Sequence, residues 1–186
     1  MVVGEDFRFG KDRCGDVETL AKLGKELGFQ VIPVKMHYAG KRILSSTYIR
    51  ELLQKGKMKQ ANRYLYQPFS LHGVVTKGFS AGSKLLNIPT ANILVPKNCV
   101  SLPFGVYQTI TEIDGISYQS ITNVGYAPTY RKNTPTIETY LFDFSGNLYG
   151  KRIQISFFQY IRKERKFSSM EALKKQIEKD IEKCKA

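Results

Sequence analysis

The 186-residue sequence predicts a mainly β protein, in which an antiparallel barrel follows a partial α/β segment and precedes a C-terminal helix. Three observations support this class. The hydrophobic pattern is helical before residue 67 and mostly strand-like after it. Pro68 marks the joint, because proline disfavours helix in the residue before it. The last stretch of the chain returns to helical spacing. We therefore predict two domains, residues 1–67 and 68–186.

The composition is that of a globular chain with a large positive charge. Hydrophobic residues make up 42% and charged residues 24% of the chain, which is enough apolar material for a packed core. Lysine and arginine exceed the acids by 29 − 16 = 13, and the excess is spread along the chain. This charge predicts attraction to polyanions, and nucleic acid, a nucleoside triphosphate or an anionic membrane surface would all satisfy it.

Membrane insertion and secretion are not expected. The sequence contains no apolar run of the roughly 18 residues that a membrane span needs, and the N-terminus has no basic flank followed by an apolar run. Cys14, Cys99 and Cys184 are far apart and odd in number, which is typical of neither a disulfide framework nor a zinc site. These features indicate reduced thiols in a cytoplasm.

Strands and helices alternate in the first domain. A helix is predicted after the capping residue Asp16, with Gly28 at the position where a left-handed residue ends a helix. We expect short strands at residues 2–3 and within 29–34, and further helices at 47–55 and 58–65. This alternation is typical of α/β proteins, but roughly 65 residues is short for a complete doubly wound sheet. The segment therefore resembles the end of such a domain.

The second domain contains runs of β-branched and aromatic residues between turn signals. The runs are residues 71–76, 105–113, 117–124, 136–144 and 152–160. Their spacing predicts a compact antiparallel barrel. Ser168 and Glu171 then form a capping-box pattern, and apolar residues recur at helical intervals up to Cys184. We expect this C-terminal helix to pack its apolar stripe on the barrel.

The segment 77–92 contains two features that could bind a nucleotide. Its glycines let backbone N–H groups turn toward a phosphate, with a lysine nearby, although an ordinary basic hairpin connection would look the same. The order Gly-Ser-Lys at 82–84 excludes a Walker A loop. Thr90 and Asn92 lie two apart on an extended chain and could face one magnesium ion, or belong to an ordinary turn that enters a strand.

Acids are scarce in this chain, so an acid inside an apolar strand is a candidate for chemistry. Glu138 and Asp143 interrupt the run at 136–144, and alternation over five residues predicts that they lie on opposite faces. A carboxylate at the barrel interior or mouth could act as a general base on an alcohol, whereas a solvated outer-face acid is the ordinary alternative. His37 and His72 match no catalytic motif.

Five ordered motifs resemble the riboflavin kinase family. They are Lys77-Gly-Phe-Ser-Ala-Gly-Ser-Lys-Leu-Leu-Asn-Ile-Pro-Thr-Ala-Asn92, Asn123-Val-Gly-Tyr-Ala-Pro-Thr, Ile137-Glu138, Leu148-Tyr149-Gly150 and Ile161-Arg162-Lys-Glu-Arg-Lys-Phe167. The resemblance implies a six-stranded Greek-key barrel with a C-terminal helix. It also implies transfer of the ATP γ-phosphate to the ribityl 5′-hydroxyl of riboflavin, which yields FMN.

The same resemblance assigns roles to individual residues. The residues implied at the nucleotide and its magnesium ion are Thr90 and Asn92, which would also ligate the metal, together with Gly78, Lys84 and Tyr149. Glu138 would be the base, and Arg162 and Phe167 would belong to a flap over the flavin. Ser80, Ala81 and Asn87 depart from the family pattern, in which glycine and arginine are common at these positions. We expect these departures to weaken nucleotide binding without abolishing activity.

The first domain resembles the latter part of the FMN adenylyltransferase module of bifunctional bacterial FAD synthetases, a Rossmann-like nucleotidyltransferase. The matching stretches are 3–10 and Ser45-Ser-Thr-Tyr-Ile-Arg50, and the second implies a triphosphate contact at a helix N-terminus. The sequence lacks the His-x-Gly-His motif of that module, so we expect no FAD synthesis by the chain as written.

Two alternatives to a monofunctional kinase follow from the sequence. One is a flavin-responsive binding or regulatory protein, in which the net charge of +13 serves a partner or nucleic acid. A base at Glu138 argues against it, because a pure binding protein does not need one. The other is a fragment of a bifunctional riboflavin kinase and FAD synthetase. Riboflavin and ATP are the expected small-molecule partners, a membrane is not expected, and nucleic acid is not excluded by the charge.

Overall fold

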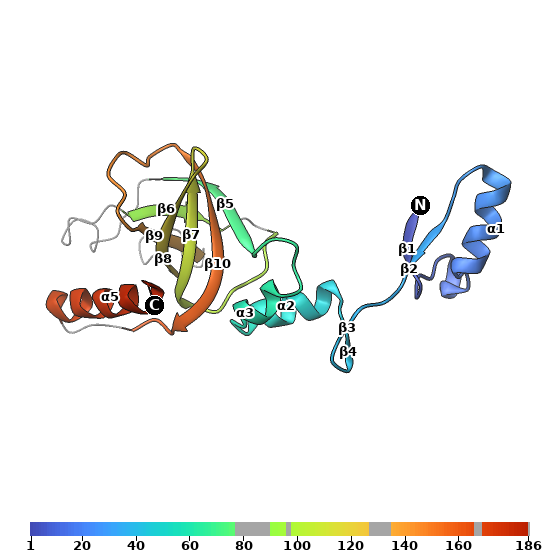
Figure 1. Cartoon of the computed structure of the whole chain (residues 1–186), viewed down its shortest axis with the longest axis horizontal. Helices are drawn as coiled ribbons and strands as arrows, with labels where there is room; N and C mark the ends of the chain where they lie inside the picture. Colours follow the sequence, from blue (N-terminus) through green and yellow to red (C-terminus); the bar gives the residue numbers. More distant parts are fainter. Residues whose placement is uncertain (77–89, 96–97, 127–134, 166–168, 186) are drawn as a thin grey trace. The chain divides into compact units, whose positions relative to one another are not determined.

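The computed structural model describes residues 1–76, 90–95, 98–126, 135–165 and 169–185. The chain divides into two compact units, Met1–Tyr48 and Ile49–Ala186 (Figure 1). This division falls upstream of the predicted domain boundary at residues 67 and 68, which stays a prediction. Within the described ranges, no helix is long and apolar enough to cross a membrane.

The first unit contains a parallel strand pair connected through a helix. β1 (Val2–Gly4) pairs in parallel with β2 (Ile32–Val34), and η1 (Lys11–Arg13) and α1 (Val17–Leu27) lie between them in the chain. The chain must return from the end of one parallel strand to the start of the next, and this requires a long crossover connection, usually a helix. β3 (Tyr38–Ala39) and β4 (Arg42–Ile43) then form a small hairpin.

Both predicted ends of α1 are confirmed. The Thr19 N–H and the Thr19 hydroxyl donate to Asp16 Oδ1 at 2.9 and 2.8 Å, so the side chain satisfies a backbone donor at the helix start. The Thr19 backbone bond is also the main reason why the pKa of Asp16 is lowered. Gly28 ends the helix in the left-handed region, with φ of 77°.

Two short helices connect the first unit to the barrel. α2 (Ser46–Gln54) spans the division between the units, and α3 (Met58–Asn62) belongs to the second unit. Asn62 joins α3 to the barrel through two hydrogen bonds: its Nδ2 donates to the Phe157 carbonyl at 2.7 Å, and its Oδ1 accepts from the Phe69 N–H at 3.0 Å. These bonds cross between segments far apart in the sequence, so α3 is anchored to the barrel.

Six antiparallel strands form the barrel of the second unit. They are β5 (Ser70–Val74), β6 (Thr90–Leu94), β7 (Gly105–Ile113), β8 (Ile116–Tyr126), β9 (Pro135–Leu141) and β10 (Arg152–Arg162). Their spatial order is β5-β10-β7-β8-β9-β6, in which β10 returns beside β7 as in a Greek key. A further bridge, in which the Thr76 N–H donates to the Asn92 carbonyl at 2.9 Å, brings the sheet close to closure. The predicted barrel class is confirmed.

One strand is shorter in the structure than the sequence predicts. The run at 136–144 was expected to be extended throughout, whereas β9 ends at Leu141 and Asp143 has a φ of 56° in the turn that follows. The prediction that one strand contains both Glu138 and Asp143 is therefore wrong, and strand alternation does not determine which way Asp143 faces.

The barrel interior contains a chain of buried hydroxyl groups. Its members are Thr109, Thr111, Ser120, Thr122 and Thr139. Thr109 is 2.8 Å from both Ser120 and Thr122, and the Thr122 hydroxyl donates to Thr139 at 2.8 Å. Because each buried hydroxyl has a partner, the network costs little desolvation and favours one pairing of β7, β8 and β9.

The C-terminal helix α5 (Met170–Lys185) covers part of the outer face of the barrel (Figure 1). A buried cluster of Val106, Ile121, Phe142 and Cys184 lies where the helix meets the strands. The Ser169 hydroxyl accepts a hydrogen bond from the Ala172 N–H at 3.2 Å and so caps the first turn. The predicted packing of this helix on the barrel is confirmed.

We expect Asn62→Ala to lower the free energy of unfolding of the second unit by roughly 1–3 kcal/mol, because the partly buried Phe69 N–H and Phe157 carbonyl lose their partner. Urea denaturation of the full chain, followed by tyrosine fluorescence, measures the change. Lys59→Ala on the exposed side of the same helix is the matched control. Equal stability of the two variants would show that α3 is not anchored through Asn62.

Candidate active site on the outer face of the barrel

A row of polar side chains crosses three neighbouring strands on one face of the sheet. Glu138 on β9 pairs directly with Asn92 on β6 and with Asn123 on β8. Directly paired residues point to the same side of an antiparallel sheet. The residues on either side of them, such as Ile137 and Thr139, are buried in the barrel, so the row lies on the outer face.

Thr90 joins this row from the same strand as Asn92. Its hydroxyl donates to Glu138 Oε1 at 2.9 Å, and both side chains are half-buried. The three residues that the sequence analysis placed at the reaction centre, Thr90, Asn92 and Glu138, are therefore close together. This geometry fits a carboxylate that is held in place by a neutral hydroxyl, at a surface that a substrate can reach.

The Tyr149 loop lies next to the same end of the barrel. The Gly150 N–H donates to the carbonyl of Val75, the residue directly after β5, at 2.9 Å. The next residue, Thr76, forms a β-bridge with Asn92. Tyr149 itself is 54% exposed. An exposed tyrosine is available to a ligand. Gly78, Lys84 and Phe167, and the departures Ser80, Ala81 and Asn87, lie outside the described residues.

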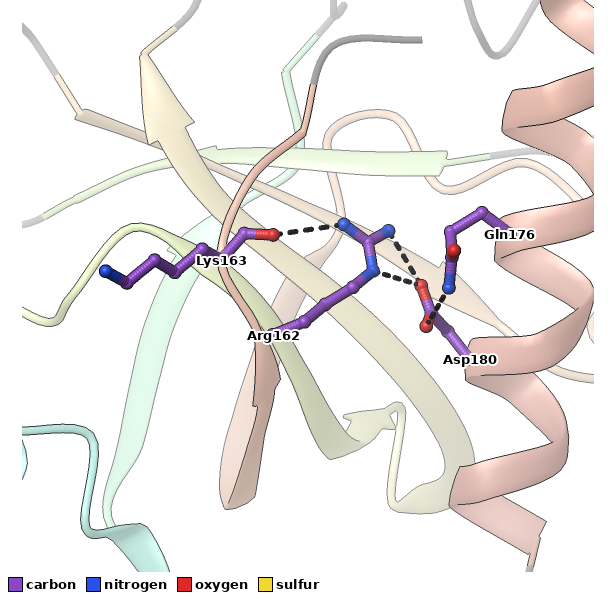
Figure 2. Close-up of polar contacts among 4 residues, drawn as sticks. All are labelled: Arg162, Lys163, Gln176 and Asp180. Atoms are coloured by element: carbon purple, nitrogen blue, oxygen red, sulfur yellow. Dashed lines mark hydrogen bonds and ion pairs between the residues drawn. The ribbon is translucent and has the colours of Figure 1, made fainter.

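Arg162 forms a buried ion pair with α5 (Figure 2). Its Nε and Nη2 both lie 2.7 Å from Asp180 Oδ2, while Gln176 Nε2 donates to Asp180 Oδ1 at 2.8 Å. Asp180 is fully buried, and the Arg162 side chain is 14% exposed. A buried carboxylate needs such partners, so Arg162 fixes the end of β10 to the helix. Its predicted contact with a flavin stays a prediction.

Two polar residues, Asn123 in the row and Glu164 next to it, were not singled out from the sequence. Asn123 Nδ2 donates to Glu164 Oε1 at 3.0 Å, which brings a second carboxylate to the strand beside Glu138. Both residues belong to motifs that resemble those of the riboflavin kinase family. The signal that could have found Glu164 is the scarcity of acids, which it shares with Glu138.

The donor set of the row suits a hard cation better than a soft one. Within the described part of the chain, no group of three or more His, Cys, Asp or Glu side chains could hold a metal ion. Thr90, Asn92 and Glu138 instead offer hydroxyl, amide and carboxylate oxygens from adjacent strands. Magnesium prefers oxygen ligands, and it keeps several positions for water and phosphate. The residues present therefore fit magnesium bound together with a phosphate-bearing ligand.

The fold and the site define a nearly closed β-barrel with a hydroxyl-held carboxylate on its outer face, and the comparisons with known proteins identify the family. The riboflavin kinase family model matches residues 65–186, and the FAD synthetase model matches residues 1–48. The chain therefore belongs to the riboflavin kinase family.

Curated relatives resemble the chain over nearly its whole length. Bifunctional riboflavin kinase/FMN adenylyltransferases from Buchnera aphidicola subsp. Schizaphis graminum and Bacillus subtilis are 39% and 38% identical over 98% and 96% of this chain. The chain spans 59% and 57% of their lengths. A crystal structure described as a macrolide-efflux protein from Streptococcus pneumoniae matches 96% of this chain and 57% of its own, with a TM-score of 0.83 and 30% identity.

We expect Asp180→Ala to lower the free energy of unfolding by about 3–5 kcal/mol, because it leaves the Arg162 guanidinium without its buried partner. Glu178→Ala, at an exposed position of the same helix, is the control. Urea denaturation of the full-length variants measures both changes. A double variant, Arg162→Met with Asp180→Leu, removes both charges and should recover much of the lost stability. If it is destabilised as much as Asp180→Ala, the unpaired charge of Arg162 is not the cause of the loss.

The three free cysteines should differ in reactivity. Burial, and to a smaller extent the Asp180 carboxylate, raises the pKa of Cys184 to about 11, and burial also raises the pKa of Cys99. A raised pKa leaves little thiolate at pH 8, so iodoacetamide should label exposed Cys14 first and Cys184 last. Mass spectrometry of timed samples gives the order. Labelling in denaturant, where the order should vanish, is the control, and rapid labelling of native Cys184 would contradict the docking of α5.

Proposed function

We propose that this chain is a riboflavin kinase, which transfers the γ-phosphoryl group of ATP to the ribityl 5′-hydroxyl of riboflavin to give FMN and ADP. The observation that carries the proposal is the position of Glu138, which lies between Asn92 and Asn123 and accepts a hydrogen bond from Thr90. The match to the riboflavin kinase family over residues 65–186 supports it.

Glu138 is the general base of the proposed reaction. Its carboxylate takes the proton from the 5′-hydroxyl as the oxygen of that hydroxyl forms a bond to the γ-phosphorus. The bond between the γ-phosphorus and the β,γ-bridging oxygen breaks at the same time, and ADP leaves with the electron pair. The Thr90 hydroxyl holds one carboxylate oxygen at 2.9 Å, which fixes the orientation of the base before the substrate arrives.

Thr90 and Asn92 are the residues that would hold the magnesium ion. When bound, magnesium supplies charge neutralisation for the phosphate oxygens of ATP. The Thr90 hydroxyl donates its hydrogen bond to Glu138, so the lone pairs of the Thr90 oxygen remain as acceptors. Asn92 lies opposite Glu138, and its strand is held to the β5 side of the barrel by the Thr76 bridge.

The remaining site assignments rest on the motifs. Gly78 and Lys84 are proposed to contact the phosphates, and Tyr149 is proposed to lie at the nucleotide. Arg162 and Phe167 are proposed for the flavin side, where Arg162 acts through the segment that its ion pair with Asp180 anchors. Such positioning and charge neutralisation account for most of the catalysis in phosphoryl transfer.

The family match over residues 1–48 supports the proposal that residues 1–67 derive from an FMN adenylyltransferase-like domain. FAD synthesis, the second activity named for the relatives, is not part of the proposed function of this chain. A cytoplasmic location, inferred from free cysteines, and small-molecule partners without a nucleic-acid role are likewise proposed.

The proposed function predicts that Glu138→Gln lowers kcat for FMN formation by about 100- to 10,000-fold while the KM for riboflavin changes little, because the amide keeps the shape of the base and cannot accept the proton. Chromatography of reactions that contain full-length protein, riboflavin and Mg-ATP measures the product. Parallel reactions with FMN and Mg-ATP test for FAD. Removing divalent metal with EDTA should abolish turnover, and magnesium should restore it.

Glu112→Gln is the matched control, because Glu112 is exposed at the opposite end of β7 from the residue that pairs with Asn123. Its kinetics should equal those of the wild type. Riboflavin binding without any FMN formation by the wild type would overturn the kinase proposal in favour of a flavin-responsive binding protein. Equal activity of the Glu138→Gln variant and the wild type would remove Glu138 from the role of base.

A further inference from the structure

We infer that Glu164 is a substrate-recognition residue, whose carboxylate accepts hydrogen bonds from the internal hydroxyls of the polyol chain that carries the reacting hydroxyl. The inference rests on the proposed function, because it assigns the alcohol substrate to a particular side of the site. It starts from the hydrogen bond between Asn123 Nδ2 and Glu164 Oε1, at 3.0 Å.

The position of Glu164 relative to the base follows from the register of the sheet. Asn123 lies directly opposite Glu138, and Glu164 binds Asn123. The Glu164 carboxylate therefore lies over β8, against Asn123 and Gly125 on the outer face. β8 and β9 are neighbouring strands about 4.8 Å apart, so this carboxylate lies on the β8 side of the base, roughly one strand spacing away. A short polyol that reacts at Glu138 extends from the base toward β8 and Glu164.

Gly125 provides the space in which the Glu164 carboxylate lies. A Cβ atom at residue 125 would approach Glu164 Oε1, and the carboxyl carbon would be 2.8 Å from it. Gly125 and Asn123 point to the same face of β8, since they are two residues apart. The glycine therefore leaves open the surface on which the carboxylate rests, and an alanine there would displace it.

The buried ion pair next to Glu164 fixes the backbone from which it extends. Arg162 Nη1 donates to the Lys163 carbonyl at 3.2 Å, while its Nε and Nη2 are bound to Asp180 on α5 (Figure 2). The residue immediately before Glu164 is therefore tied to the same guanidinium as the helix. This arrangement restrains the Glu164 backbone before any substrate binds, which reduces the entropy lost on binding.

The chemistry of a carboxylate determines what Glu164 can recognise. An ionised carboxylate only accepts hydrogen bonds, and its two oxygens can accept several, so the Asn123 amide leaves capacity for further donors. The hydroxyls of a polyol are such donors, whereas phosphate oxygens offer none and carry like charge. Glu164 therefore favours the alcohol substrate on the β8 side of Glu138, and leaves the β6 side, with Thr90 and Asn92, to the phosphates.

Steady-state kinetics of the full-length protein with two flavin substrates test this inference. One substrate is riboflavin, and the other is a flavin whose side chain is 5-hydroxypentyl, which keeps the terminal hydroxyl and lacks the internal ones. We expect Glu164→Ala to raise the KM for riboflavin roughly tenfold, with little change in kcat, and to leave the KM of the analogue unchanged.

Two further variants separate recognition from a structural effect. Gly125→Ala keeps the Glu164 carboxylate and displaces it, so it should reproduce the selective rise in the KM for riboflavin to a smaller degree. Glu112→Ala, at an exposed position far along the barrel, should behave as the wild type with both substrates. Urea denaturation of each variant shows whether it is folded, and fluorescence titration with each flavin gives binding independently of turnover.

Each outcome decides between the inference and the proposed function. An equal rise in the KM for both flavins, or no rise for riboflavin, would overturn the role of Glu164 while FMN formation by the wild type preserves the kinase assignment. If the wild type neither phosphorylates nor binds riboflavin, the proposed function fails, and the inference fails with it. Unequal effects on the two flavins, repeated by Gly125→Ala, support the inference.

Discussion

The pairing of β6, β9 and β8 is the constraint on which the site depends. Asn92, Glu138 and Asn123 face the same side only because they are direct partners in an antiparallel ladder. A slip of one residue would turn Glu138 into the barrel and bring Thr139 to the surface. The buried hydroxyl chain opposes that slip, because Thr139 bonds to Thr122 of β8 inside the barrel. The hydroxyl network inside the barrel and the polar row outside it therefore depend on the same strand register.

The ion pair between Arg162 and Asp180 fixes a different part of the molecule, the last strand relative to the last helix. Buried ion pairs contribute little net stability, because desolvation of both charges offsets their attraction. Their geometry is nonetheless specific, since a guanidinium and a carboxylate must meet in a defined orientation. Here the same guanidinium also binds the Lys163 carbonyl, so one residue fixes both the helix and the start of the segment that bears Glu164.

Local features of this fold could be predicted from the sequence, and long-range ones could not. The caps of α1 and the limits of β7 follow from residues close together in the chain, such as Asp16 and Thr19. The turn at Asp143 was missed, because an apolar run around it resembles a continuing strand. The ion pair joins residues 18 positions apart on different elements, and no periodicity indicates such a pair.

The candidate site shows the same division. Thr90, Asn92 and Glu138 were identified because motifs place them, and their proximity depends on strand pairing that composition does not encode. Glu164 was missed for a related reason, since its hydrogen bond to Asn123 joins two residues that lie 41 positions apart in different motifs. Motifs of a family name residues singly, whereas the structure reveals which of them face one another.

Charge is distributed unevenly along the row, and this gives the proposed reaction a direction. The β6 end presents the neutral oxygens of Thr90 and Asn92, in a chain with a net charge of +13, which favours anionic phosphates and their cation. The β8 end presents Glu164, which favours neutral hydroxyl donors. Glu138 lies between the two ends, where the proposed reaction would bring an alcohol from one side to a phosphorus from the other. A base in the middle of the row can take the proton of the incoming hydroxyl, which is compatible with the in-line transfer proposed for this chain.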